Sequence, residues 1–105
     1  MTVQMESREQ ELVAWLAGEI DHHTAQPLRE QVDATVERLT PRTLWLDFGD
    51  VTFMDSSGVG LVMGRYRLMR LLGGELRVSG TSERIRQMMQ MAGLDKLDIW
   101  GKEGA

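Results

Sequence analysis

The run 53–60, Phe-Met-Asp-Ser-Ser-Gly-Val-Gly, holds the residues best suited to chemistry. It places two hydroxyl groups between a carboxylate and a glycine, just ahead of an apolar pattern typical of a helix. Serine hydroxyls act as nucleophiles or accept phosphoryl groups. Ser and Asp are also favoured at the start of a helix, so Asp55, Ser56 or Ser57 would equally fit a structural cap. Both interpretations are open at this point.

Three chemistries compete at this run. A serine nucleophile needs a base, which His22 or His23 would supply, but the strained Gly-x-Ser-x-Gly elbow is missing from the sequence. A phosphate-binding loop needs a P-loop or Gly-x-Gly-x-x-Gly pattern, and Gly58, Gly60 and Gly64 match neither. A phosphoryl acceptor needs only an exposed hydroxyl on a segment that a kinase can bind. We therefore favour phosphorylation over hydrolysis or nucleotide binding.

A second polar group is the run 18–25, Gly-Glu-Ile-Asp-His-His-Thr-Ala. Adjacent histidines suggest a metal site, but the chain has only two His and no Cys, and neighbouring side chains on a helix do not face each other. We expect no metal there. Asp21 is either a helix cap or a residue that acts beside Ser57.

Strands are expected on either side of the first helix. Alternation over Leu12–Ile20, with apolar residues on both sides, predicts a central strand covered on both faces. Val3 and Met5 predict a shorter strand that pairs antiparallel to it across a turn at 7–10. Residues 43–48 predict the next strand.

A helix is predicted between these strands, with Thr24 as N-cap, Pro27 in its first turn and Pro41 after its end. Its apolar face is formed by Leu28, Val32, Val36 and Leu39, and its solvent face by Arg29, Glu30, Asp33, Glu37 and Arg38. A strand, helix, strand unit of this kind has a right-handed crossover, so the loops 18–24 and 49–58 should meet at one edge of the sheet.

The second half repeats the alternation. A largely buried helix from Val59 should end at Gly73-Gly74, followed by a short strand with Leu76 and Val78. Ser82 or Thr81 should cap a further helix, and residues 97–100 suggest a last edge strand. Buried positions are expected on the last two helices at Val62, Met63, Tyr66, Met69, Leu61, Leu68, Leu72, Ile85, Met88, Met89, Met91 and Ala92, and solvent-exposed ones at Arg65, Arg67 and Arg70. The pattern predicts an α/β fold with a small mixed sheet of four to five strands and helices packed against it.

Composition and net charge indicate what kind of protein this is. The chain has 105 residues, about the size of one domain, and a formal net charge of -4 without a basic patch, which argues against nucleic-acid binding. The lack of Cys fits a reducing cytosol. The sequence has no apolar run long enough for a membrane span and no signal-like N-terminus, so we expect a cytoplasmic protein.

A phosphate on Ser57 would act through charge. It would add about -1.5 to -2 at the positive end of the helix dipole, where it should not unfold the helix. Acidic residues are expected near the same sheet edge at Asp21, Asp47, Asp50 and Asp55. The phosphate would then deepen a negative patch and repel a partner.

The two runs, together with Gly-Arg-Tyr at 64–66, Gly-Gly-Glu at 73–75 and Met-Ala-Gly-Leu at 91–94, closely resemble the anti-sigma F factor antagonists of spore-forming bacteria, which are STAS domain proteins. The resemblance extends over nearly the whole chain and implies a single STAS domain over residues 1–105. Antagonists of the general stress branch more often have Asp-Ser-Thr-Gly and lack the paired His. The chain departs from its relatives at the end, where Trp100 is followed by only five residues.

The resemblance implies a partner-switching regulator that is not an enzyme and needs no cofactor. In its unphosphorylated form it would bind an anti-sigma factor that is also a serine kinase, and so release the sporulation sigma factor. The kinase would phosphorylate Ser57, and a PP2C-type phosphatase would remove the phosphate. The implied partner-binding residues are Asp21, His22, His23, Thr24, Asp55, Ser56, Ser57 and Gly58. The alternative is a STAS-type interaction or sensing domain of a stress or transporter system without a phosphorylation cycle.

Overall fold

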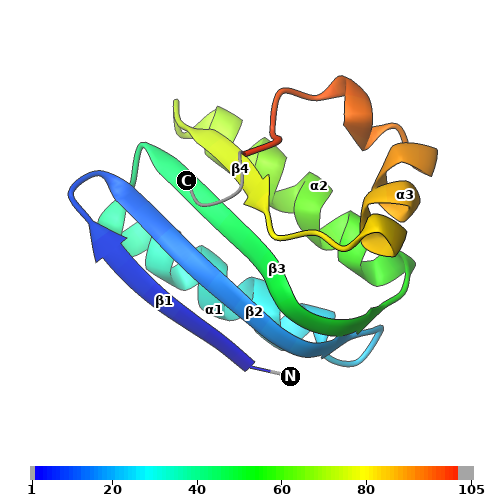
Figure 1. Cartoon of the computed structure of the whole chain (residues 1–105). Coiled ribbons are helices and arrows are strands. Elements are labelled where there is room, and N and C mark those ends of the chain that lie inside the picture. The colour runs from blue at the N-terminus through cyan, green and yellow to red at the C-terminus, as the bar shows by residue number, and fades with distance from the viewer. Residues whose placement is uncertain (1, 102–105) are drawn as a thin grey trace.

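The structure is a computed structural model and describes residues 2–101, which form a four-stranded sheet with helices packed against it (Figure 1). Strands lie in the order β1-β2-β3-β4; β1 is antiparallel to β2, and the other two pairs are parallel. This mixed α/β sheet confirms the predicted fold class. The elements are β1 (Thr2–Arg8), β2 (Glu11–Ile20), α1 (Ala25–Leu39), β3 (Thr43–Met54), α2 (Ser56–Leu71), β4 (Glu75–Ser79), α3 (Glu83–Met91) and the short 3-10 helix η1 (Leu94–Lys96).

One face of the sheet is open, contrary to the expectation for the central strand. Leu12, Ala14 and Leu16 of β2 are buried, whereas the residues between them, such as Val13 and Trp15, are only half-buried. The strands follow one another across the sheet in a single direction, and right-handed crossovers then bring α1 and α2 to the same face. Figure 1 shows both helices behind the sheet.

The helices bury most of the predicted positions, including Leu28, Val32 and Val36 on α1. Five predictions for side-chain burial are wrong. Leu39 at the end of α1 and Leu72 just after α2 are 37% and 46% exposed. Met91 is 90% exposed because α3 ends at that residue, and Ala92 beyond it is also exposed. Arg65, expected in solvent, is 5% exposed because it faces α1 and pairs there with Asp33.

Strand β3 is longer than predicted. It continues from residue 48 to Met54, where it pairs with Ile20 at the end of β2. The long loops expected at 18–24 and 49–58 are therefore short: four residues separate β2 from α1, and Asp55 alone separates β3 from α2. The register of β2 and β3 shifts between Trp15 and Ala17 and again after Gly18, which lets both strands curve together.

The chain near its C-terminal end forms a single bridge where a fifth strand was predicted. Trp100 pairs with Val78, and Ile99 O accepts a hydrogen bond from Val78 N at 2.6 Å. Ile99 is fully buried, and the Trp100 ring is covered by the Arg86 guanidinium at 4.0 Å from its centroid. The segment thus closes the β4 edge of the sheet without extending it.

Most predicted element ends are confirmed. Ser82 Oγ caps α3 by accepting from Ile85 N, and Gly73 follows α2 with φ 81, a left-handed conformation that favours glycine. The β1-β2 turn is tighter than predicted, because both strands extend until only Glu9 and Gln10 separate them. No helix in residues 2–101 is long and apolar enough to cross a membrane.

Candidate functional site at the start of the second helix

Asp55 is the residue that caps α2. It has extended backbone angles, and its Oδ1 accepts a hydrogen bond from Ser57 N at 2.8 Å. Its own N–H donates to Ile20 O at 3.1 Å, which ties the start of α2 to the end of β2. Because the carboxylate of Asp55 fills the cap position, the hydroxyls of Ser56 and Ser57 are not needed there. Ser56 is exposed and Ser57 is half-buried.

The loop between β2 and α1 is held by Asp21. Its Oδ1 accepts hydrogen bonds from His23 N at 2.8 Å and Thr24 N at 3.0 Å. These two backbone donors, with that of Thr24 first, lower the pKa of the Asp21 carboxyl. Thr24 stands at the N-cap position without capping, because its hydroxyl accepts from Asp21 N and donates to Glu19 O. Of the two roles considered for Asp21, these bonds support the structural one, in which its carboxylate holds the loop that leads into α1.

The paired histidines lie exposed on this loop. The His22 and His23 rings meet edge to face with their centroids 5.2 Å apart. Within residues 2–101 there is no group of three or more His, Cys, Asp or Glu side chains arranged to hold a metal ion.

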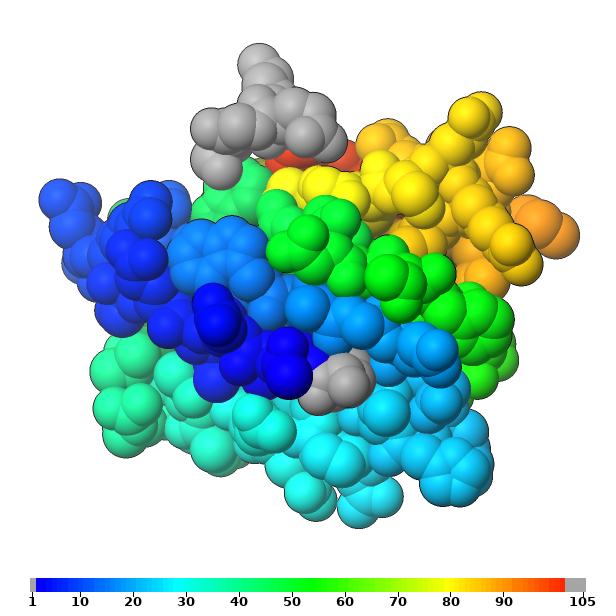
Figure 2. All heavy atoms as spheres, turned by 60° about the horizontal axis from the view of Figure 1, so that its bottom comes forward, coloured from blue at the N-terminus to red at the C-terminus, as the bar shows by residue number. Residues whose placement is uncertain are grey.

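An open hollow brings Ser57 and His22 together. The α1 side of its lining is formed by His22, Ala25, Gln26 and Arg29, and the α2 side by Ser57, Gly60 and Leu61. Figure 2 shows why these segments meet: the β2-α1 loop (light blue) and the end of β3 (green) lie side by side on the surface. The hollow surrounds the Ser57 hydroxyl with one permanent positive charge, an imidazole and the positive end of the α2 dipole.

Other predicted site residues border the hollow without lining it. His23, Thr24 and Asp21 belong to the loop on one side, and Asp55 and Ser56 to the turn on the other. Gly58 is buried, and a Cβ there would lie 2.3 Å from Met54 Cγ. The glycine therefore allows α2 to pack closely on the end of β3, which fixes where Ser57 sits.

The predicted negative patch is not assembled. Asp47 accepts hydrogen bonds from Ser79 Oγ and Gly49 N, and the seven strand residues 48–54, about 25 Å of chain path, separate it from Asp55. Asp50 is exposed on β3 opposite Ala17. The acids near Ser57 are thus Asp21 and Asp55, both engaged with backbone N–H groups, so the expectation of four clustered carboxylates is wrong.

Arg29 is exposed, as predicted for the solvent face of α1, but its place in the lining of the Ser57 hollow was not predicted. The missing information was the side of α1 against which α2 packs. Gln26, Arg29 and Asp33 lie at spacings of three and four, so they form one stripe on the helix. That polar stripe beside the apolar face was the available signal.

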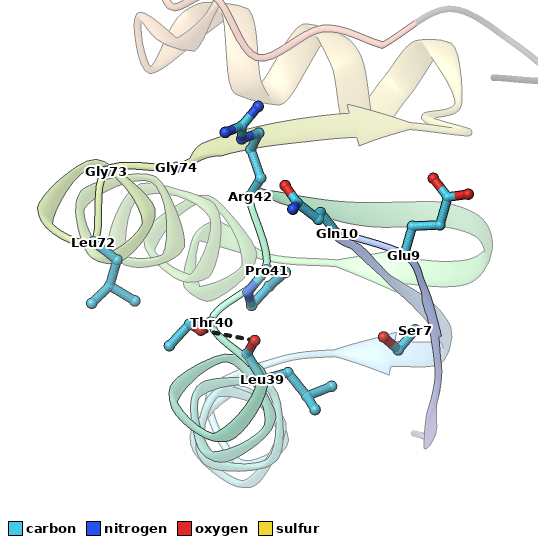
Figure 3. A pocket seen from close by; sticks show the side chains of 10 residues that line it. All are labelled: Ser7, Glu9, Gln10, Leu39, Thr40, Pro41, Arg42, Leu72, Gly73 and Gly74. Atoms are coloured by element: carbon cyan, nitrogen blue, oxygen red, sulfur yellow. Dashed lines mark hydrogen bonds between the residues drawn. The ribbon is translucent and has the colours of Figure 1, made fainter.

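A second hollow lies at the opposite end of the helices (Figure 3). It is lined by the turn between β1 and β2 and by the ends of α1 and α2, with Leu39 and Leu72 on its walls and the Arg42 side chain extending from the start of β3. Backbone hydrogen bonds join the segments around this hollow: Arg42 N donates to Gln10 O at 2.7 Å, and Glu75 N donates to Arg42 O at 2.8 Å. None of the predicted site residues lines it.

Residues 2–102 match the family model described as the STAS domain. An anti-sigma F factor antagonist of Paenibacillus polymyxa is 35% identical over 92% of this chain and 83% of its own length. An anti-sigma-B factor antagonist of Bacillus subtilis is 32% identical over 97% of this chain and 93% of its own. Relatives named as antagonists of anti-sigma F and of anti-sigma-B factors are thus both similar to the chain.

Solved structures give the same result. The unphosphorylated anti-sigma factor antagonist SpoIIAA superposes with a TM-score of 0.78 at 28% identity, covering 99% of this chain and 90% of the other. The phosphorylated form of the Bacillus cell fate determinant SpoIIAA superposes with a TM-score of 0.71 at 30% identity, covering 97% and 93%. The fold described above is therefore shared with a protein solved in both phosphorylation states.

Proposed function

This chain belongs to the STAS domain family, and on that premise we propose that it is an anti-sigma factor antagonist switched by phosphorylation of Ser57. The observation that carries the proposal is the placement of Ser57 in the first turn of α2, half-exposed, beside the β2-α1 loop, with its cap already supplied by Asp55. Its hydroxyl is then free for a phosphoryl group. The relatives named as antagonists support the same function.

The partner in this proposal is an anti-sigma factor with serine kinase activity. The Ser57 oxygen attacks the γ-phosphorus of ATP, the bond to the ADP oxygen breaks, and the hydroxyl proton passes to a base of the kinase. A PP2C-type phosphatase hydrolyses the phosphoserine and restores the binding form. The chain itself supplies the acceptor and catalyses neither step.

The surface proposed to meet the anti-sigma factor surrounds Ser57. It consists of the β2-α1 loop and the turn before α2, with the residues Asp21, His22, His23, Thr24, Asp55, Ser56, Ser57 and Gly58. A phosphate on Ser57 adds about -1.5 to -2 charge in the middle of this surface, so it blocks a closely fitted partner without refolding the chain. The interaction belongs to the cytoplasm, and the relatives from spore-forming bacteria support a role in sporulation.

The direct experiment is phosphate mapping. The chain is incubated with its cognate anti-sigma factor and ATP, and the modified residue is identified by mass spectrometry. We expect one phosphate on Ser57, none in Ser57→Ala, and full incorporation in the matched variant Ser56→Ala. Phosphate elsewhere in the chain, or none at all, would refute the proposal.

Binding measurements complete the test. Ser57→Ala should bind the anti-sigma factor as the unmodified protein does and should not be released by ATP. Ser57→Asp should bind at least tenfold more weakly, because a buried charge without a partner costs several kcal/mol at an interface. Equal affinity of Ser57→Asp and Ser57→Ala would contradict charge-based switching.

A further inference from the structure

Arg29 is the only permanent positive charge in the lining of the Ser57 hollow. It projects from the second turn of α1, is exposed, and makes no ion pair within residues 2–101. Arg38 and Arg67 are likewise exposed and without an ion pair within these residues, so a free guanidinium is not unusual in this chain. Arg29 differs from them in lining the hollow that holds Ser57.

The carboxylate one turn away is Asp33, and it is already engaged. Asp33 Oδ1 lies 2.8 Å from Nε of Arg65, whose side chain is 6% exposed. The charge of the Asp33 carboxylate is therefore balanced by this buried guanidinium. Arg29 lies near enough to affect both members of this pair electrostatically. The Asp33–Arg65 pair thus leaves Arg29 available to a second anion.

The opposite wall of the same hollow holds the Ser57 hydroxyl. A phosphoserine there would carry three acceptor oxygens at the start of a 16-residue helix, where the dipole favours an anion. A guanidinium presents two parallel N–H donors that match two phosphate oxygens. The hollow therefore combines an acceptor hydroxyl, a helix start and an unpaired arginine on facing helices.

We propose that Arg29 is the internal counter-ion of a phosphate on Ser57 and holds it across the groove between α1 and α2. This inference rests on the proposed function for the source of the phosphate. It adds a residue on α1 to a switch that the motif places wholly on α2. It also implies that phosphorylation withdraws the Arg29 guanidinium from the surface offered to a partner.

The test uses phosphoserine installed at position 57 by genetic encoding, so that no kinase is needed. The second ionisation of the phosphate is followed by ³¹P NMR during a pH titration. The charged and titratable groups near it are Arg29 on α1, Asp21, His22 and His23 on the β2-α1 loop, and Asp55 at the start of α2. All samples carry His22→Gln and His23→Gln, so that imidazole protonation does not contribute.

A cation beside the phosphate favours its dianion, so removing the cation should move the titration midpoint upward. We expect Arg29→Gln to raise the midpoint by about half a pH unit, and Arg29→Lys to leave it between the two values. The control Arg67→Gln, which removes an exposed arginine outside the hollow, should leave it unchanged. An unchanged midpoint in Arg29→Gln, or an equal rise in Arg67→Gln, would overturn the inference.

The two proposals fail separately. If the kinase modified another residue, the proposed function would fall while the titration still reported on Arg29. If the kinase modified Ser57 and the midpoint were insensitive to Arg29, only this inference would fall.

Discussion

Arg65 Nε lies 2.8 Å from Asp33 Oδ1, and this ion pair joins the middle of α2 to the middle of α1. Burial raises the pKa of Asp33 more than Arg65 lowers it, and burial also lowers the pKa of Arg65. Nη1 of Arg65 has no hydrogen-bond partner within residues 2–101. Desolvation thus outweighs attraction, and the pair contributes little net stability as long as both partners are present.

Breaking this pair should destabilise the fold. Asp33→Ala strands a buried guanidinium, and we expect a loss of about 3 kcal/mol in the free energy of unfolding, the lower end of the usual range because the Asp33 side chain is 27% exposed. The free energy of unfolding is measured by urea denaturation, and an unchanged m-value shows that the variant differs only in stability. Glu37→Ala, an exposed acid on the same helix, should change it by less than about 0.5 kcal/mol.

Removing both charges tests whether the Asp33–Arg65 pair has little net stability. Asp33→Leu combined with Arg65→Met should bring the free energy of unfolding to within about 1 kcal/mol of the unmodified protein, since apolar packing replaces an ion pair of small net value. A double variant as unstable as Asp33→Ala would show that the pair stabilises the fold.

Gly58 should not tolerate a side chain, although Ala is the better helix former. Its added Cβ would lie 2.3 Å from both Cγ and Sδ of Met54, so Gly58→Ala should lose about 1 to 3 kcal/mol through overpacking. Gly64→Ala is the matched control on the same helix: nothing lies within 4 Å of its Cβ, and it should gain about 0.5 to 1 kcal/mol. Thermal unfolding of the two variants checks this, and equal shifts would contradict the packing argument.

The elements of this fold were largely predictable because their periodicity is local. Leu28, Val32 and Val36 define a helix face wherever the helix packs, and the chain supplies turn residues at nearly every end. The open face of the sheet was not predictable in this way. Trp15 and Val13 are apolar enough for a covered strand, and only the direction of both crossovers leaves them half-exposed.

The site shows the same division. Ser57 and Asp55 belong to one run of sequence, so the cap and the acceptor were visible there. The burial of Arg65 and the position of Arg29 beside Ser57 depend on how α1 and α2 pack together, and a charge pattern alone shows neither. The extension of β3 likewise depends on pairing with β2, which moved Asp47 far from the site.

Acid should weaken the β2-α1 loop through Asp21. Its pKa in the folded state lies below the unfolded value, so its ionised form stabilises the fold above about pH 4, and that contribution is lost as the pH falls through the folded pKa. Asp21→Asn keeps an acceptor oxygen but not the charge. Between about pH 5 and 7, which lies above the pKa of Asp21 in both the folded and the unfolded chain, the difference in unfolding free energy between the unmodified protein and Asp21→Asn should be constant. It should vanish in strong acid. A difference independent of pH would show that the charge has no part in holding the loop.

Phosphorylation of Ser57 should leave the stability of the fold unchanged or slightly raised. The phosphate would lie in the first turn of α2, where the helix dipole favours an anion by about 0.3 to 1 kcal/mol at an exposed site. Genetically encoded phosphoserine at position 79 provides the contrast, because Ser79 Oγ donates to Asp47 Oδ2 at 3.0 Å and a phosphate there would face that carboxylate. We expect the thermal midpoint to fall clearly for phosphoserine at 79 and to stay level or rise for phosphoserine at 57. A fall of similar size at both positions would mean that the Ser57 phosphate acts by unfolding α2, and the proposal of a surface switch would have to be abandoned.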